Sequence, residues 1–205
     1  MVINKTKIVA TIIVATIALS ACNGCKNDIC SGATTYYFQA SAKAYPDKDS
    51  IQIGDTIWLE INCPTSFTDI SSGQTIDYSE AANFGSAIGV GQLFGQDSVV
   101  PAANEFNYQL AEGNTVVNAN VNQIREYRFV QTNNSYLFKL AVMPKEKGFF
   151  GISFSPSVNV YRNSDKCTKA NFNIEFKNTN QHFYLNENLQ GDTASSVGSY
   201  YFKVY

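Results

Sequence analysis

The residues best suited to covalent chemistry in this chain are five cysteines and a single histidine. The cysteines stand at Cys22, Cys25, Cys30, Cys63 and Cys167. Four thiolates can hold zinc, but the Cys-x2-Cys repeat typical of such sites is absent from the last four. Only Cys22 and Cys25 have that spacing, which leaves a zinc or redox pair as the alternative to disulfides. We expect disulfides, no metal and no cofactor.

The sequence contains no complete motif for a catalytic triad, a calcium loop or a nucleotide-binding loop. His182 would have to be the base of any Ser-His-acid triad, yet no Gly-x-Ser-x-Gly motif is present. Its neighbours are aromatic, so we expect a polar residue packed beside rings. The aspartates at 47, 49 and 55 lack the regular spacing of a calcium loop. The glycines of residues 85–95 lack P-loop and dinucleotide-binding spacing, and they favour a closely packed strand or loop. We therefore expect no catalytic residues.

The N-terminus carries the most specific pattern. Lys5 and Lys7 precede a mostly apolar run, residues 8–19, which is too short to span a bilayer but fits a secretory signal peptide. The following Leu-Ser-Ala-Cys at residues 19–22 resembles the lipobox of bacterial lipoproteins. That resemblance implies cleavage after Ala21, with diacylglycerol and palmitate-type acyl chains on Cys22. It also implies an envelope protein, and the absence of Asp after Cys22 favours the outer membrane.

This interpretation divides the chain into three parts. We expect residues 1–21 to be the signal peptide, residues 22–35 to be the lipidated cysteine and a tether, and residues 36–205 to be one domain. The envelope is oxidising, and four remaining cysteines allow three disulfide connectivities. We favour Cys25–Cys30 and Cys63–Cys167, because the second pair would join the ends of two candidate strands.

Composition limits the partners. The net charge is -2 and only 16% of residues are charged, so the chain lacks the basic face of a nucleic-acid-binding protein. A mildly acidic body does not bind anionic lipid by itself, so we expect the lipid anchor to hold the protein at the membrane. Aromatic residues make up 13% of the chain. Most aromatic residues of a β-protein belong to its core, but an exposed group could bind a protein or a glycan.

The elements that must position these residues are β-strands. Apolar and polar residues alternate over 56–61, 136–142, 149–154, 172–176 and 200–205, which is the period of half-buried strands. Turn residues separate these runs, and no convincing helical stripe is present. The pattern predicts an all-β fold, a single antiparallel β-sandwich.

Two resemblances extend this prediction. Residues 136–154 and 54–59 resemble strand–loop–strand segments of immunoglobulin-like modules. Residues 49–56 and 176–185 are similar to uncharacterised lipoproteins of Bacteroidetes-type bacteria, a resemblance that implies an envelope location and no activity. We expect a non-catalytic binding or structural module. The alternative is a lipid-anchored hydrolase with paired carboxylates, for example one acting on glycans, although no spacing singles out a pair.

Overall fold

The computed structural model describes residues 30, 32–94, 98–116, 125–177, 179–186 and 198–205. The chain divides into two units, residues 1–33 and 34–205. The predicted signal peptide and Cys22 lie outside the described residues. Within the described ranges, no helix has the length and apolar character needed to cross a membrane.

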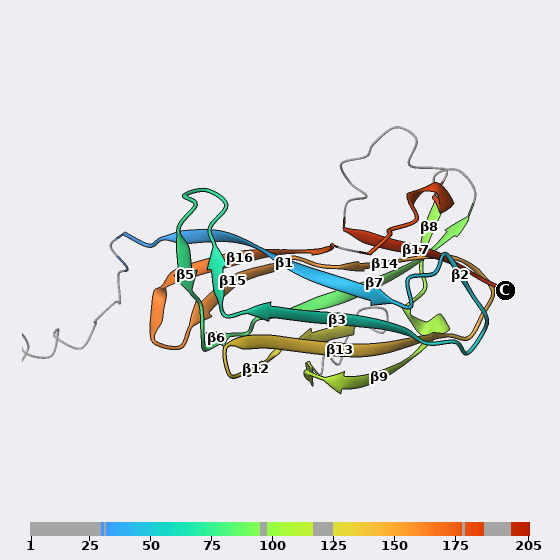
Figure 1. Cartoon of the computed structure of the whole chain (residues 1–205), viewed down its shortest axis with the longest axis horizontal. Helices are drawn as coiled ribbons and strands as arrows, with labels where there is room; N and C mark the ends of the chain where they lie inside the picture. The colour runs from blue at the N-terminus through green and yellow to red at the C-terminus, as the bar shows by residue number, and fades with distance from the viewer. Residues whose placement is uncertain (1–29, 31, 95–97, 117–124, 178, 187–197) are drawn as a thin grey trace, which may run out of the picture. The chain divides into compact units, whose positions relative to one another are not determined.

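The second unit is all-β, as the alternating patterns predict, and it contains two large sheets and one small one (Figure 1). The eight-stranded sheet contains β1 (Thr35–Tyr45), β3 (Ile57–Pro64), β6 (Ala81–Ala82), β9 (Phe106–Glu112), β12 (Val130–Thr132), β13 (Ser135–Pro144), β15 (Ser157–Arg162) and β16 (Asp165–Phe176). The seven-stranded sheet contains β2 (Ser50–Ile51), β7 (Gly85–Phe94), β8 (Ser98–Pro101), β10 (Asn114–Thr115), β11 (Arg125–Arg128), β14 (Gly148–Phe154) and β17 (Ser199–Val204). A small hairpin is formed by β4 (Ser66–Thr68) and β5 (Thr75–Asp77), and two short 3-10 turns are η2 (Ala103–Glu105) and η3 (Phe183–Leu185).

All five runs with a two-residue period are strands: β3, β13, β14, β16 and β17. Burial follows the alternation, because successive side chains of a strand point to opposite faces of the sheet. In β3, for example, Ile57, Leu59 and Ile61 are fully buried while Trp58 and Glu60 are partly exposed. Along most of these strands one face supplies the core and the other is at least partly exposed, although Ala141 in β13 and Tyr201 in β17 are buried on the second face.

The prediction of a purely antiparallel fold is wrong at two pairings. β1 runs parallel to β16, with Phe38 opposite Phe172, and β2 runs parallel to β17. The inward residues of β1 are Phe38 followed by three alanines at 40, 42 and 44. Their small side chains give a weak hydrophobic pattern, so the sequence did not single out this long strand. β1 nevertheless lies in the middle of its sheet, between β3 and β16.

Aromatic rings join the two large sheets in one core. Phe138 of β13 lies 6.1 Å, ring centroid to centroid, from Phe154 of β14. Phe154 in turn lies 5.4 Å from Phe176 of β16, which lies 5.8 Å from Tyr200 of β17. Contacts alternate between the sheets, so the two inner faces pack directly on each other. Much of the aromatic content of the chain is buried here, as expected.

The glycine-rich run is a strand, β7, which confirms one of the two structures that its sequence favours. A Cβ added at Gly85 would lie 2.0 Å from the carbonyl oxygen of Tyr127 in the neighbouring β11. A Cβ at Gly91 would lie 2.6 Å from a methyl group of Val99 in β8. Glycine is required here for close approach of strands and side chains rather than for phosphate binding.

Candidate functional site

The cysteines form a different pattern from the predicted one. Cys30 and Cys167 form a disulfide, and Cys63 is a free thiol. Both predicted pairs, Cys25–Cys30 and Cys63–Cys167, are therefore wrong, and Cys25 itself lies outside the described residues. The physical reason concerns Cys63, which continues the inward face of β3 opposite Tyr136. Its thiol is buried in the apolar core, and this burial raises its pKa to about 12.

His182 is held by two partners. It is 4% exposed, its Nδ1 lies 2.9 Å from the carbonyl oxygen of Tyr201, and its Nε2 lies 3.4 Å from a carboxylate oxygen of Asp47. Its ring also lies 5.4 Å from that of Tyr200. His182 lies in the segment between β16 and β17, and its two ring nitrogens join that segment to the loop after β1 and to β17. This arrangement serves packing, as the aromatic neighbours of His182 predict.

The three aspartates of the possible calcium loop have separate roles. Asp47 accepts a hydrogen bond from the Asn180 amide, and Asp55 accepts one from the Gln52 amide within its own turn. Asp49 accepts hydrogen bonds from the hydroxyls of Ser50 and Tyr184, and the Tyr184 hydrogen bond is the main cause of its lowered pKa. In the part of the chain that the structure describes, no group of three or more His, Cys, Asp or Glu side chains is arranged to hold a metal.

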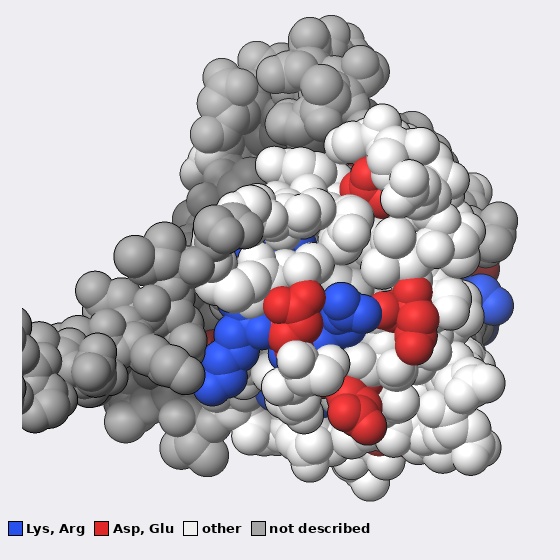
Figure 2. Space-filling view, turned by 90° about the vertical axis from the view of Figure 1, so that its left-hand side faces the viewer, with Lys and Arg blue, Asp and Glu red and all other residues white. Residues whose placement is uncertain are grey.

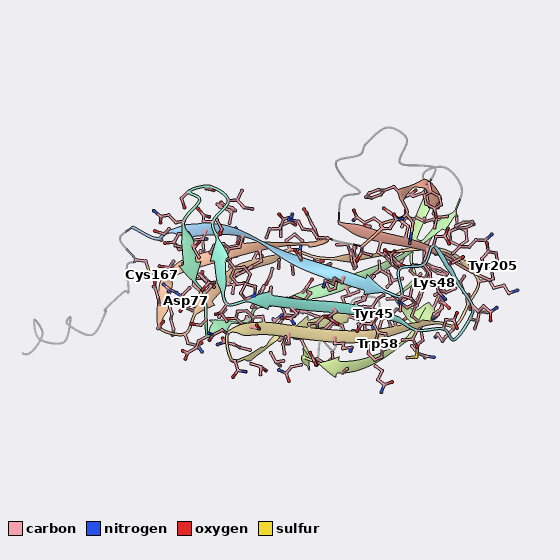
Figure 3. The ribbon with its side chains drawn as sticks, in the orientation of Figure 1. Tyr45, Lys48, Trp58, Asp77, Cys167 and Tyr205 are labelled. Carbon is pink, nitrogen blue, oxygen red and sulfur yellow. The ribbon has the colours of Figure 1, made fainter. Side chains whose placement is uncertain are left out.

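A cluster of aromatic and charged side chains lies on the outer face of the eight-stranded sheet. It consists of Tyr45 on β1, Trp58 and Glu60 on β3, Glu112 on β9 and Lys139 on β13, and we call it the Trp58 face. The alternation that buries Ile57, Leu59 and Ile61 turns Trp58 and Glu60 outward. Strand register then sets Tyr45 opposite Trp58, and Figure 3 shows these two residues close together.

Lys139 is the centre of the Trp58 face. Its Nζ lies 5.0 Å from the centroid of the Trp58 ring and 5.8 Å from that of Tyr45, within cation–π distance. The Tyr45 hydroxyl donates a hydrogen bond to Glu60 at 3.1 Å. The side chain of Tyr45 raises the pKa of Lys139 most, and the charges of Glu60 and Glu112 add to this effect. Lys139 is therefore a charged group within cation–π distance of both rings.

Charges of opposite sign alternate across four strands at this place. Lys43 on β1 is opposite Glu60, Glu60 is opposite Lys139, and Lys139 is opposite Glu112. Directly opposed residues on neighbouring strands share a face and have Cβ atoms about 4.5–5.5 Å apart. The two glutamates are therefore separated by the width of one strand, with an ammonium group between them.

A shallow groove of about 170 Å³ adjoins these residues. Its lining consists of Glu60, Ile61, Asn62, Glu112, Leu137 and Lys139. The groove offers carboxylate acceptors, an amide and an ammonium donor beside two ring faces. Hydroxyl groups on a ligand could bind the polar atoms while its apolar face packs on Trp58 or Tyr45.

No protein-family model, curated protein or solved structure matches this chain significantly. The chemistry of the site itself must therefore support any functional conclusion. The alternation within residues 56–61 already predicts an outward Trp58 and Glu60. The places of Tyr45, Glu112 and Lys139 cannot be predicted from the sequence, because only the strand register brings these residues together.

Proposed function

We propose that this protein is an envelope lipoprotein and a non-catalytic glycan-binding module. The N-terminal pattern supports acylation of Cys22 and an outer-membrane location. It consists of Lys5 and Lys7, the apolar run and the Leu-Ser-Ala-Cys motif. The lipid anchor attaches the protein to the membrane, and the β-body contacts the partner. The facing sheets, which share one aromatic core and are mostly antiparallel, support an immunoglobulin-like sandwich for this body.

The Trp58 face is the observation that carries the proposed ligand class. Two partly exposed rings flank a lysine, and a polar groove with carboxylates and an amide adjoins them. Sugars combine apolar C–H faces with many hydroxyls, so they match both halves of this surface. A protein partner would be expected to contact a larger area than this groove provides.

The hydrolase alternative is supported by one observation, the placement of Glu60 and Glu112 at the same groove. Glycoside hydrolysis needs one protonated and one ionised carboxyl group on either side of the scissile bond. Here Lys139 stands between the two glutamates in the strand register, so its side chain occupies the position between the carboxylates that a scissile bond would need. Binding without bond cleavage is therefore the function that the geometry favours.

Trp58 is the only tryptophan of the chain, so its fluorescence reports on this face alone. We expect neutral oligosaccharides of glucose, mannose or N-acetylglucosamine, titrated one by one, to change the emission of the mature protein, with no release of reducing sugar. Trp58→Ala and Lys139→Ala should abolish or weaken binding, measured by calorimetry. Tyr37→Ala is the matched control, because Tyr37 is an exposed aromatic residue at the other end of β1.

Three results would contradict the proposal. Calorimetric binding that survives Trp58→Ala would place the glycan elsewhere, and no binding by any of these sugars would remove the ligand class. Sugar release that is lost on Glu60→Gln or Glu112→Gln would favour the hydrolase. Anchoring is tested separately by labelling cells with a palmitate analogue, where a Cys22→Ser variant that keeps its label would exclude lipidation at Cys22.

A further inference from the structure

A second cavity, distinct from the Trp58 face, lies beside the turn between β15 and β16. Its volume is about 320 Å³, and it is lined by Ala82, Asn83, Tyr161, Arg162, Asn163 and Lys166. Figure 2 views the end of the body that carries β5, β6 and this turn, and it shows basic and acidic side chains next to one another across that end. The cavity thus combines two cationic side chains with two amides and a tyrosine.

Arg162 is fixed in place before any ligand binds. Its Nη1 donates to the carbonyl oxygen of Asp77 at 3.2 Å, its Nη2 donates to Asp165 at 3.3 Å, and its guanidinium lies 5.6 Å from the centroid of the Tyr78 ring. A guanidinium has five N–H donors, of which these contacts use two. The Nε is buried without a partner, which leaves two terminal N–H groups for a ligand. A preorganised arginine loses little side-chain entropy on binding.

The lining of the cavity carries two positive charges, Arg162 and Lys166, and no carboxylate. Three carboxylates lie behind it: Asp165 pairs with Arg162, and the backbone carbonyls of Asp77 and Glu80 accept hydrogen bonds from Arg162 and Asn163. Hydrogen bonds from the Thr168 side chain and the Cys167 amide lower the pKa of Asp165, so this carboxylate stays ionised. Asp165 pairs with Arg162, whereas Lys166 is the exposed cation of the lining. A singly charged anion is the ligand that this lining suits.

The neutral lining indicates what else the anion must carry. Asn83 and Asn163 offer amide donors and acceptors, and Tyr161 offers an aromatic ring beside them. Amides of this kind recognise hydroxyl groups, and a ring face packs against C–H groups. A volume near 300 Å³ is at the lower end for small-molecule pockets, which suits one sugar ring rather than a longer chain.

We propose that this cavity binds the carboxylate-bearing sugar unit of an acidic glycan, a uronic acid. The carboxylate is taken by Arg162 and Lys166, and the ring hydroxyls are taken by Asn83 and Asn163. This site is independent of the Trp58 face, so either one can fail without the other. Together they would allow one body to bind both neutral and acidic sugars.

The test is a calorimetric titration of the full mature protein carrying Trp58→Ala, which disables the Trp58 face, with D-glucuronate at low salt and with D-glucose and inorganic phosphate as comparison ligands. We expect this variant to bind glucuronate only. Lys166→Glu should weaken binding about tenfold, because it reverses the charge that the ligand neutralises. Lys145→Glu is the matched control, since Lys145 is an exposed lysine on the turn after β13. A thermal melt shows that each variant is folded.

Each other outcome overturns the inference. Equal binding of glucose would indicate a neutral-sugar pocket, and binding of phosphate without glucuronate would indicate a phosphate site. An equal loss in Lys166→Glu and Lys145→Glu would mean that overall charge, rather than this cavity, attracts the anion. The absence of glucuronate binding at millimolar concentration would reject the site directly.

Discussion

The hydroxyl of Tyr136 donates a hydrogen bond to the carbonyl oxygen of Tyr78, and the two oxygens are 2.7 Å apart. The same hydroxyl accepts a hydrogen bond from the Ala81 amide at 2.9 Å. Tyr136 is 1% exposed and belongs to β13, whereas Tyr78 and Ala81 lie on either side of the turn that leads into β6. One buried phenol thus attaches that turn to the core of the large sheet.

Removing this phenol oxygen should destabilise the fold. We expect Tyr136→Phe to lower the free energy of unfolding by about 1–3 kcal/mol, because a carbonyl and an amide lose their shared partner in the interior. Urea denaturation of the purified body measures this change. Tyr37→Phe is the control, since Tyr37 is exposed, and it should change stability little. Equal effects of the two substitutions would show that the buried hydrogen bonds contribute nothing.

Gly85 is expected to tolerate no side chain. The Cβ of alanine would lie 2.0 Å from the Tyr127 carbonyl oxygen, so β7 and β11 would have to separate. We expect Gly85→Ala to cost at least about 1–3 kcal/mol, as overpacked cores do. Gly198→Ala has open space around its Cβ and should stay within about 0.5 kcal/mol of the parent. Thermal melts that rank these two variants in the opposite order would contradict the strand packing described above.

Acid should destabilise the fold through its aspartates. The Tyr37 amide, at 2.7 Å, is the main cause of the lowered pKa of Asp69, and Ser72 contributes further. A carboxyl group whose pKa is lower in the folded state stabilises the fold above its unfolded pKa, near 3.9. This stabilisation is lost as the pH falls from about 4 through the lower folded pKa. Asp49 and Asp165 act in the same direction.

Melting temperatures recorded between pH 2 and pH 7 test this expectation. Asp69→Asn should melt lower than the parent at pH 7 and should lose less stability on acidification. Glu146→Gln, on the exposed turn after β13, is the matched control. Parallel curves for the parent and Asp69→Asn would show that the hydrogen bonds of Asp69 do not contribute to acid sensitivity.

Reduction of the disulfide should cost stability without unfolding the core. The Cys30–Cys167 disulfide closes a loop of 137 residues. A loop of that length stabilises a protein by about 5 kcal/mol in the chain-entropy account, and measured losses on removal of a native disulfide run from about 2 to 5 kcal/mol. We expect a phosphine reductant and Cys167→Ser to have the same effect on urea denaturation. Cys63→Ala should keep its full sensitivity to the reductant. Non-reducing peptide mapping should recover Cys30 linked to Cys167, and a peptide that links Cys63 to either of them would refute the connectivity.

Cys63 should be unreactive in the native protein. Its pKa is raised to about 12 by burial, so at pH 8 almost none of it is thiolate, the form that reacts with alkylating agents. We expect iodoacetamide to label Cys63 only after denaturant is added, as measured by intact mass. Rapid labelling of the folded protein would mean that the inner face of β3 opens readily to solvent.

Sequence alone predicted the strands that bury large residues in alternation, such as β3 and β14, because their pattern needs no knowledge of the partner strand. It did not predict β1 or the parallel pairing of β1 with β16. Alanines alternate only weakly in hydrophobicity with polar residues, so the strand pattern of β1 is faint. Parallel pairing between distant segments depends on the partner strand and has no signature in the local sequence. The predicted disulfide pairs were wrong for a related reason, because the number of cysteines does not show which of them face the core.

The candidate site, like the fold, was predictable only where it depends on a single strand. The outward position of Trp58 is a local property of β3 and was implied by its sequence. Its neighbours Tyr45 and Lys139 come from strands 13 residues before and 81 residues after it, and only the register of β1, β3 and β13 brings them together. Surfaces built across strands are predictable only when the order of strands in the sheet is known.

The parallel pairs have a consequence for the order in which the molecule can form. β1 and β2 come early in the second unit, but their parallel partners, β16 and β17, come near its end. During synthesis these early strands therefore have an unpaired edge until almost the whole chain has emerged. Distant pairings slow folding, and unpaired edges invite association between chains. Truncation before β17 would remove the strand that joins β2 to β14 in one sheet, and truncation before β16 would remove the strand that joins β1 to β15 in the other. Each sheet can therefore close only after its late strand has been made.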